Sequence, residues 1–102
     1  MDIRYSKSLN SLTIYIFGEL DEHFSNTNRS VVDDLIDKQG SLDKVIFDLS
    51  GLTFMDSTGI GFLIGRYKKL NKLKVPSYIK GAGFSVEKVI DLSGLYSIMP
   101  KI

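Results

Sequence analysis

The chain has 102 residues, of which 43% are hydrophobic and 25% are charged, and this length accommodates one domain, residues 1–102, with a modest core. Thirteen Lys and Arg against twelve Asp and Glu give a net charge of +1, which argues against direct nucleic-acid binding. The absence of cysteine excludes disulfides, thiol nucleophiles and cysteine-ligated metals.

The first 20 residues predict two strands. Apolar residues alternate with polar ones at Ile3 and Tyr5 and again over residues 12–16, which is the period of a half-buried strand. Turn-forming residues 7–11 separate the two segments and favour a hairpin. We expect Gly18 to end the second strand.

The middle of the chain predicts two helices that flank a buried strand. Residues 25–28 all offer oxygens that can cap a helix over residues 27–38, and Gly40 follows in the place of a left-handed terminator. The compact apolar run over residues 45–49 predicts a strand buried on both faces. After a polar loop, a second helix is expected over residues 58–72.

The last third predicts a strand and a helix. The strand over residues 75–79 is entered through Pro76, which places it at or near a sheet edge. Ser85 is the expected cap of a third helix that Gly94 ends, and residues 98–99 are a candidate for a last short strand. The resulting order, β-β-α-β-α-β-α, predicts an α/β fold with a small mixed sheet, because alternating strands and helices pair in parallel.

The junction over residues 52–62 carries the clearest functional pattern. It places Asp56, Ser57 and Thr58 at the start of the second helix. One interpretation is a helix cap, since these residue types satisfy free N–H groups. The other is a phosphate acceptor, because three such residues in a row exceed what one cap needs. The residues alone do not choose between Ser57 and Thr58 as the acceptor.

The same helix has two unusual features. Gly59, Gly61 and Gly65 crowd it at a cost of about 1 kcal/mol each relative to alanine, which indicates the close approach of another backbone. Phe62 falls off the apolar stripe of the helix, beside Arg66. We expect Phe62 to face solvent as a partner contact, and the alternative is that it packs beneath a loop.

Catalytic motifs are missing from this junction. Ser57 lacks a Gly-x-Ser-x-Gly elbow, and His23 is the only histidine that could serve as its base. The glycines match neither Gly-x-Gly-x-x-Gly nor a P-loop. We therefore predict no enzyme, no cofactor and no metal, and an enzymatic or nucleotide-binding domain is the weakest alternative.

Three motifs resemble one family. Residues 54–61, Phe-Met-Asp-Ser-Thr-Gly-Ile-Gly, continue into Gly-Arg-Tyr-Lys-Lys at 65–69, and Gly-Glu-Leu-Asp at 18–21 and Leu-Ser-Gly-Leu at 92–95 flank them. Together they are similar to STAS-domain anti-sigma factor antagonists, most of all the sporulation (anti-sigma F) type. The resemblance covers nearly the whole chain and implies the STAS fold.

The resemblance implies a phosphorylation switch. The family's phosphorylated serine follows the aspartate, which is Ser57 here, with Asp21, Asp56, Thr58 and Gly59 around it. The implied partner-binding residues are Ser57, Gly59, Gly61, Phe62, Gly65 and Arg66. In this scheme the unphosphorylated chain binds an anti-sigma factor that is also a serine kinase, and a sigma factor is released. The kinase then modifies Ser57, the complex dissociates, and a PP2C-type phosphatase restores the serine.

Further expectations follow from the resemblance. Family members usually continue into a final helix, and this chain stops at Ile102, so either that helix is lacking or the sequence is a shortened one. The free chain is expected to be a monomer. Because no apolar run is long enough to span a bilayer and residues 1–5 lack a signal-peptide core, we expect a cytoplasmic protein without membrane contact. The second hypothesis is a STAS scaffold module of a stress-signalling or transporter-associated system.

Overall fold

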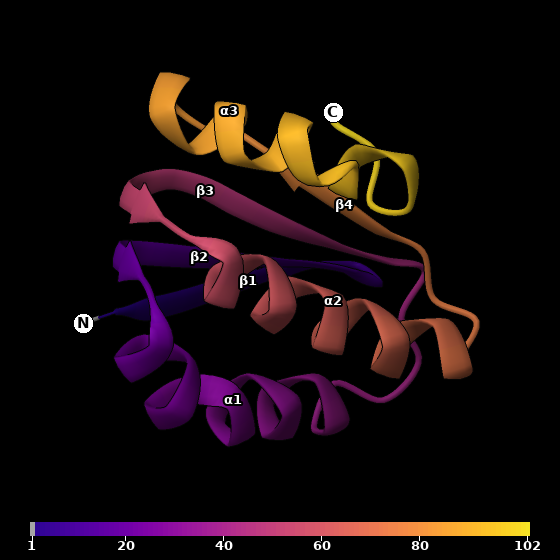
Figure 1. Cartoon of the computed structure of the whole chain (residues 1–102). Coiled ribbons are helices and arrows are strands. Elements are labelled where there is room, and N and C mark those ends of the chain that lie inside the picture. Colours follow the sequence, from indigo (N-terminus) through magenta and orange to yellow (C-terminus); the bar gives the residue numbers. More distant parts are fainter. Residues whose placement is uncertain (1) are drawn as a thin grey trace.

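Within residues 2–102, which the computed structural model describes, four strands form one sheet and three α-helices pack on it (Figure 1). Along the chain the elements are β1 (Ile3–Ser8), β2 (Ser11–Leu20), α1 (Glu22–Asp37), β3 (Lys44–Met55), α2 (Ser57–Lys72), β4 (Ser77–Lys80), α3 (Phe84–Ser93) and a 3-10 turn η1 (Leu95–Ser97). The sheet has the order β1-β2-β3-β4, with β1 antiparallel to β2 and the other pairs parallel. The predicted mixed α/β sheet is confirmed.

One face of the sheet carries the core. Ile14, Phe47 and Ile79 lie in one row across β2, β3 and β4, and all three are fully buried. Their neighbours on the other face, such as Ile46 and Tyr78, are only partly buried. Since α2 contacts both α1 and α3 and lies between them, the helices share one face (Figure 1). The prediction that β3 is buried on both faces is therefore wrong.

The first helix starts five residues earlier than predicted. Asp21 is its N-cap in extended conformation, and the Asp21 Oδ1 accepts a hydrogen bond from the Phe24 N–H at 3.0 Å. Ser25 and Asn28, predicted as caps, are instead buried inside the helix, where the Asn28 Nδ2 donates to the Phe24 carbonyl. Nor does Gly18 end β2: it has a φ of +96° at an irregularity, and the strand continues to Leu20.

Strand β3 is longer than its predicted segment. It runs through the expected polar loop to Met55, which pairs with Leu20 at the end of β2. The register explains the extension, because β2 pairs with β3 at both of its ends, from Ser11–Lys44 to Leu20–Met55, with two irregularities between them. Strand β4 lies at the sheet edge directly after Pro76, as predicted.

Helix α3 and the end of the chain differ in detail from the predictions. Gly83 occupies the N-cap position without a side-chain hydrogen bond, so Ser85 is not the cap. Gly94 ends the helix with a φ of +76°, as predicted. The expected strand at 98–99 is replaced by a single parallel bridge between Ile79 and Lys101, at the free edge of β4. Met99, two residues before Lys101, is fully buried.

Glu87 of α3 binds two residues near the end of the chain, Tyr96 and Lys101. The Lys101 ammonium lies 2.6 Å from the Glu87 Oε1, and the Tyr96 hydroxyl donates to the same oxygen at 2.9 Å. Lys101 first, and Tyr96 second, lower the pKa of Glu87 below its ordinary 4.5. Burial, reinforced by Glu87, raises the pKa of Tyr96 to about 12.

This cluster predicts a loss of stability in acid. Because the pKa of Glu87 is lower in the folded chain, its stabilising effect is complete above pH 4.5 and disappears as the pH falls through the folded value. We expect Glu87→Gln to lower the urea midpoint at pH 7, and the difference from the parent chain to vanish toward strong acid. A difference that stays constant from pH 7 to pH 3 would contradict the assignment.

Candidate functional site

Two aspartates open two helices at the same edge of the sheet. Leu20 and Met55 are register partners at the ends of β2 and β3, and each is followed by an aspartate that caps a helix. Asp21 and Asp56 have nearly the same backbone angles, with φ of −120° and −122° and ψ of −168° and −169°. The starts of α1 and α2 therefore lie side by side, with Asp21 and Asp56 at neighbouring strand ends.

The hydrogen bonds that cap α2 do not involve the side chain of its first residue, Ser57. The Asp56 Oδ1 accepts hydrogen bonds from the N–H groups of Thr58 at 3.0 Å and Gly59 at 3.2 Å. Ser57 is exposed at the first position of α2, and within residues 2–102 its hydroxyl has no hydrogen-bond partner. Thr58 is partly buried. The helix-cap interpretation therefore applies to Asp56, while Ser57 stays available.

The three glycines of α2 have different surroundings. A Cβ on Gly59 would lie 2.6 Å from the Leu20 carbonyl oxygen and 2.7 Å from the Met55 Cγ, so this glycine lets α2 approach the strand ends. A Cβ on Gly61 or Gly65 would meet no heavy atom within 4 Å. Spaced four residues apart, Ser57, Gly61 and Gly65 share one side of the helix. We call this surface the glycine stripe.

The contrast predicts opposite effects of alanine. Gly59→Ala should lower the free energy of unfolding by about 1–3 kcal/mol, because the methyl group would collide with backbone. Gly61→Ala should raise it by roughly 0.5–1 kcal/mol, because alanine favours the helix and the space is open. Urea unfolding of the two variants measures this, and changes of the same sign would contradict the assignment.

Phe62 does not face solvent, so the expected exposed contact is wrong. Its side chain is 2% exposed and packs edge-on against Phe24 of α1, with ring centroids 5.9 Å apart. The Arg66 guanidinium lies 4.9 Å from the centre of the Phe62 ring. The alternative of packing beneath a loop is also incorrect, because Phe62 lies between two helices.

Arg66 is likewise buried, as part of an ion pair that joins α1 to α2. Its Nε lies 2.8 Å from the Asp33 Oδ1, its Nη2 donates to the Asp33 Oδ2 at 3.4 Å, and its Nη1 donates to the Phe62 carbonyl at 3.1 Å. Burial lowers the pKa of Arg66, and Asp33 opposes this shift. An arginine remains charged under these conditions, so Arg66 holds the two helices together and is not displayed as a free charge.

Two shallow hollows follow the seam between α1 and α2. The first, about 420 Å³, lies beside Thr58 and Gly61 and has the exposed Arg29 on its α1 side. The second, about 430 Å³, continues past Gly65 to the end of α2 and carries the Asp37–Lys69 ion pair. With the glycine stripe they form a continuous surface that begins at the acceptor candidates.

In residues 2–102, no three His, Asp or Glu side chains are grouped so that they could hold a metal ion. No helix in the same range is both long and apolar enough to cross a membrane. The arrangement instead combines an accessible hydroxyl with an open helix surface.

The fold and the site define a STAS domain. The family model for the STAS domain matches residues 2–102, and the chain belongs to this family. It is 35% identical over 89 residues to an anti-sigma F factor antagonist from Paenibacillus polymyxa, covering 87% of this chain and 75% of the relative.

Solved structures agree with this assignment. The structure of the anti-sigma factor antagonist SpoIIAA in its unphosphorylated form superposes with a TM-score of 0.79 at 29% identity, covering 98% of this chain and 87% of that one. The phosphorylated form of the Bacillus cell fate determinant SpoIIAA superposes with a TM-score of 0.71 at 28% identity, covering 98% and 90%.

Proposed function

We propose that this chain is an anti-sigma factor antagonist of the sigma F type, acting as a binding partner and a kinase substrate and not as an enzyme. In its unphosphorylated form it binds an anti-sigma factor that is also a serine kinase, and sigma F is released. Phosphorylation of Ser57 by that kinase ends the interaction, and a PP2C-type phosphatase restores it. Its relatives, named anti-sigma F factor antagonists, support this assignment.

The proposal rests on one observation: the exposed hydroxyl of Ser57 lies at the N-terminal end of the glycine stripe. Gly61 and Gly65 each cost the helix about 1 kcal/mol relative to alanine, and no neighbour within the fold requires them. A partner backbone lying along the stripe would require them. The same partner would cover Ser57, so the acceptor would lie inside the interface.

The cap of α2 explains why the phosphate would act as a switch. A phosphate adds about −1.5 to −2 charges, and a helix start often stabilises such an anion through free N–H groups. Here Asp56 already accepts from the N–H groups of Thr58 and Gly59. The phosphate on Ser57 would therefore stay hydrated beside two carboxylates, Asp56 and Asp21, and a docking partner would have to desolvate it.

The acceptor can be tested by incubating the chain with its cognate anti-sigma kinase and ATP. We expect mass spectrometry to place one phosphate on Ser57, since Thr58 is partly buried. Ser57→Ala should abolish the modification, whereas Thr58→Val should retain it. Modification on Thr58, or on neither residue, would contradict the proposed acceptor.

A further inference from the structure

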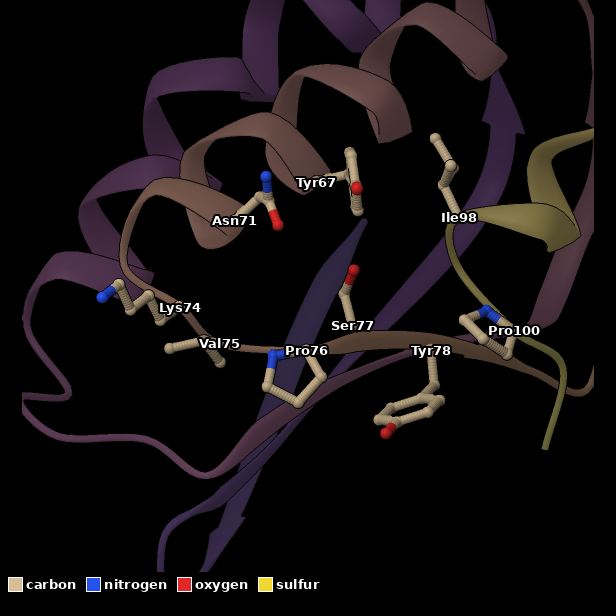
Figure 2. Close-up of a pocket in the computed structure, with 9 residues that line it drawn as sticks. All are labelled: Tyr67, Asn71, Lys74, Val75, Pro76, Ser77, Tyr78, Ile98 and Pro100. Carbon is tan, nitrogen blue, oxygen red and sulfur yellow. The ribbon is translucent and has the colours of Figure 1, made fainter.

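A cavity lies at the end of α2 opposite to Ser57. It has a volume of about 480 Å³ and is formed by the last turn of α2, the start of β4 and the segment after η1 (Figure 2). Its apolar walls come from Tyr67, Val75, Pro76, Ile98 and Pro100. Its α2 residues, Tyr67 and Asn71, follow Ser57 in the helix by roughly 15 Å and 21 Å along the axis, at about 1.5 Å per residue.

The most buried polar group of this cavity lacks a partner. Ser77 is 3% exposed, and its Oγ makes no hydrogen bond within the described residues 2–102. Figure 2 shows the hydroxyl directed from β4 into the space between Tyr67 and Ile98. Ser77 pairs in register with the fully buried Val45, at a position where an apolar side chain would avoid the cost of an unpaired hydroxyl. That cost points to a ligand that supplies the missing hydrogen bond.

The charge at the rim indicates what the ligand carries. Among the described residues that line the cavity, Lys74 is the only charged one. Its ammonium group extends outward, away from Ser77 (Figure 2), and Lys74 is exposed. The cavity thus offers a hydroxyl at its floor, apolar walls and a cation at its mouth.

We propose that this cavity binds a small organic acid with an apolar body. A hydrogen-bonding group at one end of the ligand would reach the Ser77 Oγ, its apolar body would lie against Tyr67, Val75 and Pro76, and its carboxylate would meet Lys74 (Figure 2). The volume falls within the range of about 300–1,000 Å³ found for small-molecule sites. This proposal is independent of the switch at Ser57.

Three probes separate the parts of the proposal: 6-hydroxy-2-naphthoate, 2-naphthoate, which lacks the hydroxyl, and 2-naphthol, which lacks the carboxylate. Each is titrated into the ¹⁵N-labelled full chain. We expect saturable shifts of the Tyr67, Val75 and Ser77 amide signals, with 6-hydroxy-2-naphthoate binding most tightly. The absence of saturable shifts at these residues up to millimolar concentration would overturn the proposal.

Two variants and a control assign the contacts. Ser77→Ala should raise the melting temperature of the chain. It should also weaken the binding of 6-hydroxy-2-naphthoate by roughly fivefold, the effect of one hydrogen bond, without changing the affinity for 2-naphthoate. Lys74→Gln should weaken the binding of both naphthoates and leave the affinity for 2-naphthol unchanged. Lys72→Gln, just outside the cavity, should change none of the three affinities. If Ser77→Ala weakens both naphthoates equally, or if Lys72→Gln acts like Lys74→Gln, the assignment fails.

Discussion

Ser57→Asp is expected to weaken binding to the anti-sigma kinase by about 100-fold or more while leaving the fold intact. The carboxylate would stand at the head of the glycine stripe next to Asp56, whose cap already uses the nearby N–H groups. Leaving a charge unpaired inside an interface costs about 2–5 kcal/mol, which corresponds to the expected loss. Calorimetric titration measures the affinity, and circular dichroism checks the fold.

Ser85→Asp is the matched control for this substitution. It places the same charge in the first turn of another helix, on an exposed residue of α3 away from the glycine stripe. The affinity of Ser85→Asp for the anti-sigma kinase should equal that of the parent chain. Ser57→Ala should bind the kinase with the same affinity as well. Equal losses for Ser57→Asp and Ser85→Asp would show that net charge, and not the position of Ser57, governs binding.

Asp33→Ala is expected to lower the free energy of unfolding by about 3 kcal/mol, the lower part of the range for breaking a buried ion pair. The Arg66 side chain is only 7% exposed and would lose its counter-ion, while the 28% exposure of Asp33 gives water some access. Urea unfolding at neutral pH measures the change. The loss would also loosen the packing of Phe62 on Phe24.

Two further variants separate burial from charge. Asp37→Ala breaks the Asp37–Lys69 ion pair, which has the same 2.8 Å length and joins the same helices, but the Asp37 side chain is 57% exposed. It should cost no more than about 0.5 kcal/mol. Asp33→Leu combined with Arg66→Met should recover most of the stability that Asp33→Ala loses. Equal costs for Asp33→Ala and Asp37→Ala would contradict a buried pair.

Most of the fold could be predicted from local patterns. The strands β1 and β2 and the left-handed Gly94 depend on neighbours in the sequence, and all three are confirmed. The predicted alternation in burial holds for β2 only, because β1 is exposed at every residue after Ile3. The start of α1 could not be predicted in this way, because four consecutive residues after Phe24 can all cap a helix. The overlooked signal is the repeated pattern of an apolar residue followed by aspartate, Leu20–Asp21 and Met55–Asp56, since both aspartates are caps.

The burial of Phe62 and Arg66 could not be predicted from one apolar stripe along α2. A helix that packs only on a sheet has one apolar stripe, and Phe62 falls outside it. Helix α2 is covered by α1 as well as by the sheet, so its buried arc is wider and includes Phe62 and Arg66. In the same way, only the tertiary contacts with Leu20 distinguish Gly59 from Gly61.

We propose that the phosphorylation state of Ser57 decides whether this chain displaces sigma F from the anti-sigma kinase. The most direct measurement adds either the unphosphorylated chain or the Ser57-phosphorylated chain to a preformed complex of the anti-sigma kinase with sigma F, and follows free sigma F by size-exclusion chromatography. We predict stoichiometric release by the unphosphorylated chain and none by the phosphorylated chain. Equal release by both forms, or release by neither, would contradict the account.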